Sequence, residues 1–217
     1  MTMRKIMVFS RFERFWHWTQ MLFIFSLLFT GFVVRGLIPL IDFETAVVLH
    51  VWSAIGLLIL WILATFWLLT TGTWKHFLPT TEGLWRVMRF YAYGIFKGEH
   101  HPYKKAYLRK HNPLQALAYL WLKLIIFPLL WSSGIVYLVY RFWSHIPNAT
   151  HWLEAVSLIH VSTAFLLLVF VIVHVYMLTI GHSITTHIKP MITGYDEIEL
   201  TEAEEAFLEE SRTITRQ

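Results

Sequence analysis

The sequence predicts an all-α integral membrane protein, a four-transmembrane-helix bundle with both termini in the cytoplasm. Three observations predict this fold class. The chain of 217 residues is 56% hydrophobic and only 15% charged, whereas soluble domains carry about 25% charged residues. Its apolar residues gather into four long runs, each close to the roughly 20 residues that a helix needs to cross a bilayer. Its basic residues lie almost entirely on one side of those runs. These features exclude a soluble globule, a disordered chain and a coiled coil.

The chain contains four candidate membrane spans. They are expected at about residues 16–34, 46–71, 113–140 and 153–181. The first is too long for the apolar region of a cleaved signal peptide, so it is expected to be retained. The third opens on Pro113, which suits the first turn of a helix. It contains one charge, Lys123, and a proline, Pro128, that is expected to kink it.

The basic residues set the expected orientation, because loops on the cytoplasmic side carry the excess of Lys and Arg. Four lie before the first span and eight in the loop between the second and third spans, against Arg35 and Arg141 on the other side. This topology explains the basic character without a nucleic-acid partner. We therefore expect a multi-pass protein of the bacterial inner membrane, surrounded by lipid. The segment 83–96 mixes aromatic and basic residues and is expected to form a helix in the membrane interface.

The charge balance also divides the chain. Residues 1–195 hold 16 Lys and Arg against 6 Asp and Glu, and residues 196–217 hold 2 against 8. Residues 1–195 are therefore expected to form the membrane domain, and residues 196–217 an acidic, solvated cytoplasmic tail.

The chain has twelve histidines and no cysteine. The lack of cysteine excludes disulfides, thiolate catalysis, iron–sulfur clusters held by this chain and covalent c-type haem. A single histidine near a helix end is more often structural than a ligand. An imidazole inside the hydrocarbon region nevertheless needs a partner, so histidines within the spans are candidate functional residues.

Four of these histidines are expected to form two pairs at different depths. His160 and His174 lie 14 residues apart on the fourth span, which is about 21 Å along a helix and about 40° short of four full turns. His17 starts the first span at the depth of His174, and His50 lies near the start of the second span at the depth of His160. We call His17 and His174 the inner pair, and His50 and His160 the outer pair, after the expected orientation. Two stacked b haems, each with one imidazole on either face of its iron, require this arrangement.

The residues around these histidines carry a family resemblance. Its motifs are Arg14-Phe15-Trp16-His17-Trp18-Thr19, Leu49-His50, Leu158-Ile159-His160 and His174-Val175-Tyr176-Met177. With them, residues 10–195 resemble the di-haem cytochrome b subunits that anchor periplasmic oxidoreductases. Examples are the gamma subunit of membrane-bound formate dehydrogenase and the b subunits of nickel–iron hydrogenase and thiosulfate reductase. The resemblance implies that His17, His50, His160 and His174 are the metal ligands of two b haems, paired as above.

The resemblance implies further site residues. Asn112 and Gln115 match an asparagine and a glutamine that help to form a quinone pocket beside the inner haem, for menaquinone or ubiquinone. The alternative is that they cap the third span. Arg14 is the expected partner of the inner haem propionates. Lys123 has no counterpart in the family, and three roles stay open for it: reaching the membrane surface, pairing with a propionate, or facing the quinone.

The expected function is electron transfer across the membrane between a periplasmic oxidoreductase partner and the quinone pool, with the chain also anchoring that partner. The outer loops are too short for a catalytic domain, so substrate chemistry is expected on another subunit, and electrons are expected through an iron–sulfur or multihaem subunit. One alternative is a stand-alone di-haem cytochrome b that oxidises quinol and reduces a soluble acceptor. Another is a histidine-rich metal or proton transporter without haem. His111 and His182 stay open as proton-handling groups.

Overall fold

The computed structural model describes residues 2–99, 102, 111–179 and 184–200. The chain divides into two compact units. The bundle unit comprises residues 15–70 and 121–182, and the loop unit comprises residues 1–14, 71–120 and 183–217. His182 and the tail beyond residue 200 lie outside the described residues.

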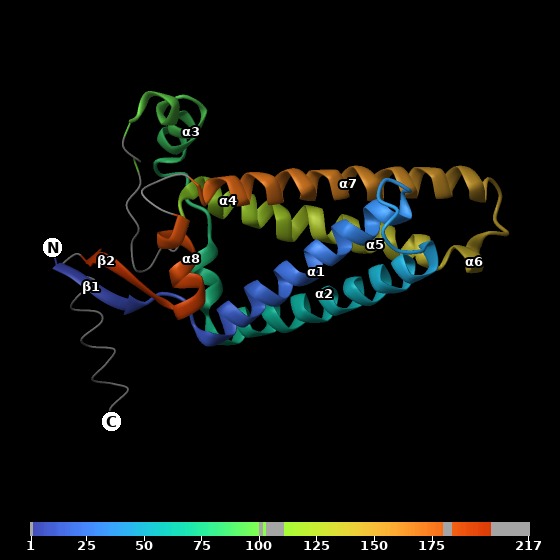
Figure 1. Ribbon diagram of the computed structural model, residues 1–217, viewed down its shortest axis with the longest axis horizontal. Coiled ribbons are helices and arrows are strands. Elements are labelled where there is room, and N and C mark those ends of the chain that lie inside the picture. Colours follow the sequence, from blue (N-terminus) through green and yellow to red (C-terminus); the bar gives the residue numbers. More distant parts are fainter. Residues whose placement is uncertain (1, 100–101, 103–110, 180–183, 201–217) are drawn as a thin grey trace. The chain divides into compact units, whose positions relative to one another are not determined.

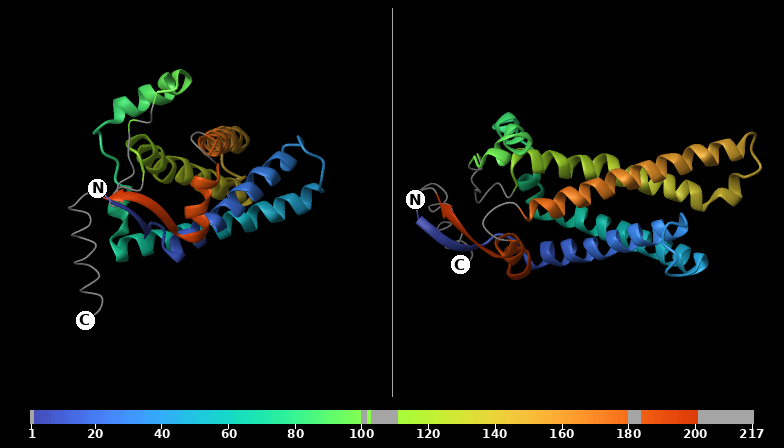
Figure 2. Two further views of the ribbon diagram at one scale, coloured as in Figure 1. Left: turned by 60° about the vertical axis from the view of Figure 1, so that its left-hand side comes forward. Right: turned by 45° about the horizontal axis from the view of Figure 1, so that its top comes forward.

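Among the described residues, four helical segments are long and apolar enough to cross a membrane, which confirms the four expected spans (Figures 1 and 2). Three are single helices, α1 (Arg11–Val34), α2 (Phe43–Thr71) and α7 (Ala149–Met177). The third span consists of α4 (Pro113–Trp121), η3 (Leu122–Ile126) and α5 (Phe127–Leu138). A short helix, α6 (Tyr140–Trp143), follows it.

The first two spans begin earlier than the apolar runs suggest, because polar residues cap them. At the start of α1, the Ser10 backbone N–H donates to the Glu13 carboxylate at 2.8 Å, and the Glu13 N–H donates to Ser10 Oγ at 3.2 Å. This is a reciprocal capping box. At the start of α2, Asp42 Oδ1 accepts from the Thr45 N–H at 2.8 Å. This bond from the Thr45 backbone lowers the pKa of the Asp42 carboxyl.

The third span is irregular just before Pro128. Segment η3 is a single π-helical turn, and Pro128 occupies the first turn of α5 directly after it. A proline has no N–H to donate and crowds the preceding turn, and a π turn accommodates such a break in the helix ladder. The expected irregularity is present as a π turn at residues 122–126.

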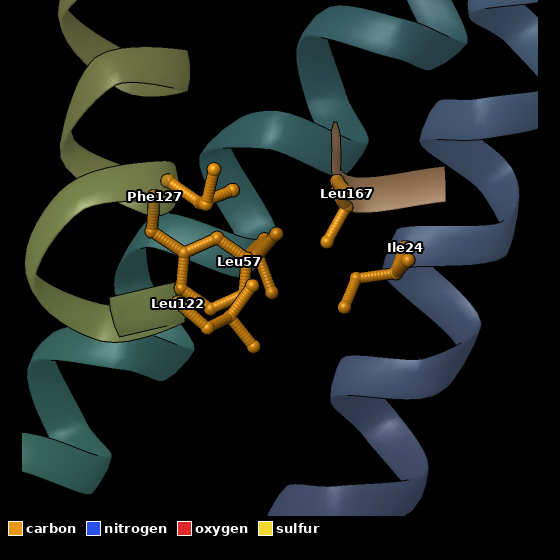
Figure 3. Close-up of a cluster of buried hydrophobic side chains, with 6 residues drawn as sticks. Ile24, Leu57, Leu122, Phe127 and Leu167 are labelled. Carbon is orange, nitrogen blue, oxygen red and sulfur yellow. The ribbon is translucent and has the colours of Figure 1, made fainter. Parts of the chain in front are cut away.

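The centre of the bundle unit is an apolar cluster to which all four spans contribute (Figure 3). Ile24 comes from α1, Leu57 from α2 and Leu167 from α7. The third span supplies Leu122, Ile126 and Phe127, and the last two are at most 1% exposed. Trp61 and Trp131 pack beside this cluster with their ring centres 4.9 Å apart.

The loop unit contains four shorter helices and a two-stranded sheet. These elements are β1 (Thr2–Met7), η1 (Thr73–Phe77), α3 (Leu84–Ala92), η2 (Gly94–Lys97), α8 (Ile184–Thr193) and β2 (Tyr195–Leu200). Helix α3 lies where the interfacial helix is expected. It is amphipathic, because Val87 and Phe90 are buried whereas Trp85 is 76% exposed.

Strands β1 and β2 pair antiparallel, with Lys5 opposite Glu197 and Met7 opposite Tyr195. The first residues of the expected acidic tail, 196–200, therefore form a strand, in which the side chain of Glu197 is exposed. Gly194 makes the turn into β2 at a φ of 89° and accepts backbone hydrogen bonds from Val8 and Phe9. Pairing basic β1 with acidic β2 brings opposite charges together, which favours this register.

Candidate haem site

The structure brings the four predicted histidines together as two facing pairs within the bundle unit. The ring centres of His17 on α1 and His174 on α7 lie 6.3 Å apart. Those of His50 on α2 and His160 on α7 also lie 6.3 Å apart. Each histidine therefore lies beside the partner that was expected from its depth in the membrane.

This spacing fits one metal ion between the two rings of each pair. An imidazole nitrogen binds a first-row metal at about 2 Å, so two rings on opposite sides of one ion have centres about 6 Å apart. A direct hydrogen bond of about 3 Å between the two rings would bring their centres to about 5 Å. Among the described residues, no group of three or more His, Cys, Asp or Glu could hold a metal. Two protein ligands suit haem iron, because the porphyrin supplies the other four.

In the outer pair, a hydroxyl group on a neighbouring helix fixes each ring. Thr30 Oγ1 lies 2.9 Å from His50 Nδ1 and donates its own proton to the Ser26 carbonyl at 2.7 Å. It therefore accepts from the His50 Nδ1–H. This bond leaves Nε2 of His50 without a proton, which is the form that binds a metal.

The same arrangement recurs on the third and fourth spans. Ser133 Oγ lies 3.0 Å from His160 Nδ1 and donates to the Leu129 carbonyl at 2.5 Å. It therefore accepts from the His160 Nδ1–H. Both outer histidines are held in the Nδ1–H tautomer by a hydroxyl whose proton is already engaged one turn back.

A glycine follows each of these hydroxyl residues, and it lies beside the histidine ring. A Cβ atom at Gly134 would lie 3.2 Å from Cε1 of His160, and one at Gly31 would lie 3.8 Å from Cε1 of His50. A side chain at Gly134 would therefore crowd the His160 ring, which would have to move by a few tenths of an ångström.

Thr30-Gly31 and Ser133-Gly134 were not among the residues predicted from the sequence. The available signal was a hydroxyl residue followed by glycine, deep within the first and the third apolar run.

The inner pair has different surroundings. Nδ1 of His17 is buried and has no hydrogen-bond partner among the described residues, and the ring meets Trp18 edge-on at 5.3 Å. The His174 ring stacks on Phe170, with an interplanar angle of 10° and centres 5.9 Å apart. A buried imidazole nitrogen without a partner is consistent with a site that is completed by another group.

Arg14 is held by the end of a neighbouring helix. Its Nη1 donates to the carbonyl of Ile192 in the last turn of α8, a favourable place for a cation because of the helix dipole. Its Nε is buried and has no hydrogen-bond partner in the part of the chain that the structure describes. The structure thus joins Arg14 to α8 within the loop unit, and its role toward a propionate stays a prediction.

Asn112 and Gln115 cap the third span, as the alternative interpretation predicts. The Gln115 N–H donates to Asn112 Oδ1 at 2.8 Å, and the Asn112 N–H donates to Gln115 Oε1 at 3.1 Å. Asn112 Nδ2 also donates to the Tyr91 hydroxyl at 3.3 Å. Burial raises the pKa of Tyr91, so this hydroxyl stays protonated. Within the described part of the chain, Gln115 Nε2 is left as a donor without a partner.

His111, which stayed open as a proton-handling group, lies against two aromatic rings of the loop unit. Its ring centre is 5.2 Å from that of Phe77 and 4.9 Å from that of Tyr119. These contacts neither assign nor exclude a role in proton transfer. His182, the other such residue, lies outside the described residues.

Four membrane-length helices that present two facing histidine pairs define a class of protein, the multi-span membrane haem proteins. Comparison with known proteins identifies the family. The model of the prokaryotic cytochrome b561 family matches residues 8–194. The chain belongs to this family of membrane proteins, which bind haem b and transfer electrons across the membrane, and the resemblance to bacterial cytochromes b is confirmed.

A relative from Escherichia coli (strain K12) has the name "Putative cytochrome YdhU". The two sequences are 28% identical over 198 residues, which cover 88% of this chain and 74% of the relative. The family match, over residues 8–194, includes all four spans and the positions of both histidine pairs.

The first prediction tests the pairing. His50→Ala and His160→Ala should each remove the same component of the reduced haem spectrum, and His17→Ala and His174→Ala should each remove the other component. Each substitution leaves one imidazole without its partner across the site, so the two members of a pair should share one phenotype. His151→Ala, an exposed histidine on α7, is the control and should keep both components. A spectrum in which His17→Ala matches His160→Ala would contradict the pairing.

The second prediction concerns the hydroxyls of the outer pair. Thr30→Val and Ser133→Ala should raise the reduction potential of the outer haem and leave the inner one unchanged. Removing the acceptor weakens the imidazole as a donor to iron and so disfavours the oxidised state. The stability cost should be small, about 0.6 kcal/mol for a hydrogen bond within a membrane. Redox titration monitored by absorbance measures both potentials.

Thr163→Val is the matched control for this prediction. Thr163, on α7, is buried like Thr30 and Ser133, and its hydroxyl donates to the Ile159 carbonyl at 2.7 Å. Equal shifts in all three variants would show that the effect is general loss of packing and not loss of the bond to the histidine.

Proposed function

We propose that this chain carries electrons across the bacterial inner membrane through two b haems, between a periplasmic oxidoreductase partner and the quinone pool. The single observation that supports it most is the matched geometry of the two histidine pairs, each 6.3 Å between ring centres and both built on α7. One pair would hold one haem. The haems would supply the one-electron chemistry, and the chain's own residues bind them, orient them and keep them apart.

The residues between the two pairs support passage of electrons without water. Ile24 lies seven residues after His17, Leu57 seven after His50, and Leu167 midway between His160 and His174. Seven residues span about 10.5 Å of helix, so these three side chains mark a layer midway between the pairs. Phe127 and Ile126 fill the same layer. An apolar layer excludes water and so prevents protons from leaking along the path of the electrons.

The loops support the proposed orientation of the chain and the proposed partner subunit. We infer that both termini face the cytoplasm, on the distribution of basic residues described above. The two loops on the opposite side are short, with about eight residues between α1 and α2 and about ten between α5 and α7. Neither can form a catalytic domain, so the proposal assigns substrate chemistry to a partner subunit. That subunit, or an iron–sulfur or multihaem subunit with it, would dock at the outer haem.

The proposed quinone site lies near the start of the third span, at Asn112 and Gln115. The cap uses the oxygen atoms of both side chains, whereas Nε2 of Gln115 keeps its donor capacity. An amide N–H is suited to a quinone oxygen. The proposal therefore gives Gln115 the direct contact and Asn112 the task of holding Gln115 in place.

The third prediction tests the proposal as a whole. Protein purified in detergent should contain two non-covalent b haems per chain, measured as pyridine haemochrome against chain concentration. Substituting both members of one pair, as in the His17→Ala/His174→Ala double variant, should leave one. A wild-type ratio near one, or no haem with the protein folded, would contradict two-haem electron transfer.

The fourth prediction separates quinone binding from helix capping. Gln115→Glu keeps the oxygen that caps the helix but removes the free Nε2 donor, and it should slow haem–quinone electron exchange about fivefold, for one lost bond of about 1 kcal/mol. Both haem spectra should persist. Stopped-flow mixing of the reduced protein with a soluble quinone analogue measures the exchange.

Asn112→Ser is the companion variant, because serine also caps a helix but cannot reproduce the bond to Tyr91. If exchange is unchanged in both variants while Asn112→Ala lowers the melting temperature, Asn112 and Gln115 are capping residues only and the quinone site lies elsewhere.

A further inference from the structure

A lysine lies within the third apolar span, where a cation is costly. Lys123 is the second residue of the π turn η3, ten residues after the start of the span at Pro113. Charged side chains within membrane spans are rare and face partners or functional sites. Single π turns within helices also occur frequently at functional sites.

The surroundings of Lys123 provide only part of what an ammonium group needs. Its Nζ lies 4.4 Å from the centre of the Trp16 ring, a cation–π contact. The Trp16 indole N–H donates to Gln20 Oε1 at 3.0 Å, which fixes the ring. Within the described part of the chain, Lys123 has no hydrogen bond and no carboxylate partner.

Lys123 lies at the edge of the buried face of its helix. Leu122 and Ile126 point into the central cluster, whereas Leu124 and Ile125 are 64% and 44% exposed. The cation is therefore beside the interior of the bundle and near the inner pair, because Trp16 directly precedes His17.

The other basic residues of the bundle unit lie toward its opposite end. Arg35 follows α1 and lines a cavity of about 360 Å³ with Ser157 and Glu154, close in sequence to His160. Arg141 lies on α6, after the third span. Among the described residues of this unit, Lys123 is therefore the Lys or Arg that serves the half containing His17 and His174.

A haem at the inner pair would bring negative charge into this half. Haem b carries two propionate carboxylates, and a carboxylate in an apolar interior needs a cation or several donors. Arg14, the partner expected from its position three residues before His17, belongs to the loop unit and donates to the Ile192 carbonyl. Lys123 has the complementary charge, a half-buried position and no other ion-pair partner among the described residues.

We propose that Lys123, held on the face of Trp16, is the counter-charge for a propionate of the haem bound by His17 and His174. The inference rests on the proposed two-haem function. A cation close to the haem favours the reduced state, which carries one positive charge less than the oxidised state. Lys123 thereby keeps the reduction potential of the inner haem above the value it would otherwise have.

The experiment compares Lys123→Met, Lys123→Gln and Lys123→Arg in redox titrations of the purified protein. The inner haem is identified as the component that His17→Ala removes. Methionine and glutamine should lower the potential of that haem by at least a tenfold change in its reduction equilibrium, which is 59 mV for one electron. Arginine should keep the wild-type value, and the potential of the outer haem should not change in any variant.

Reconstitution with haem dimethyl ester, in which both propionates are esterified, tests the assigned contact. If Lys123 pairs with a propionate, the difference in inner potential between wild type and Lys123→Met should become smaller with the ester, because the carboxylate that holds the ammonium beside the haem is lost. A difference of unchanged size with the ester would overturn the propionate pairing. Unchanged potentials together with slower quinone exchange in Lys123→Met would also overturn it and assign the lysine to the quinone.

If a neutral variant binds the inner haem poorly, its haem content tests the proposal in place of its reduction potential. Loss of the inner haem from Lys123→Met and Lys123→Gln, with retention in Lys123→Arg, supports a required cation. Loss from all three variants would overturn the proposal, because it would show a requirement for the shape of lysine. A wild-type protein without two haems would instead contradict the proposed function itself.

Discussion

An imidazole ring in hydrocarbon has two nitrogens that water cannot reach, and each needs a partner. The outer pair meets this demand at Nδ1 of both rings, through contacts that involve all four spans. Thr30 on α1 bonds His50 on α2, His50 faces His160 on α7, and His160 bonds Ser133 on α5. Each hydroxyl in turn donates to a carbonyl of its own helix. Satisfying these two rings therefore specifies which helices are neighbours, and it does so where the apolar surfaces alone, being all alike, specify little.

The same helices also keep the two pairs apart. The 14 residues between His160 and His174 form almost four turns, so both rings lie on one face of α7 with Leu167 midway. Ile24 and Leu57 occupy the matching positions on α1 and α2. The regular rise of the helix thus produces polar, apolar and polar layers in succession. Electrons can cross an apolar layer of this thickness, whereas hydrated protons cannot, and this difference is what a transmembrane electron carrier requires.

The spans and the histidine partners could be predicted because both depend on local rules, the length of apolar runs and the helical repeat. Thr30 and Ser133 could not, since a hydroxyl that donates to the carbonyl one turn back is ordinary in an apolar helix. The second bond of each hydroxyl, to a histidine on the facing helix, can be identified only in the structure. Residues 196–200 were expected to begin an acidic tail, and composition could not predict that they pair with β1, because this pairing joins segments about 190 residues apart. From the sequence, Asn112 and Gln115 fit either a quinone site or a helix cap. The structure shows that their side chains form the cap.

The two pairs have equal spacing but unequal surroundings, and this asymmetry bears on function. If the two pairs hold haems as proposed, the hydroxyl acceptors on His50 and His160 would strengthen these imidazoles as donors and favour oxidised iron. Among the described residues, Nδ1 of His17 has no such acceptor, and a cation lies over the ring of Trp16, the residue before His17. Both differences would act in the same direction, toward a lower potential at the proposed outer haem and a higher one at the proposed inner haem. Under this proposal, identical axial ligands would support downhill electron flow from the outer to the inner pair, with the gradient set by side chains that do not bind the metal.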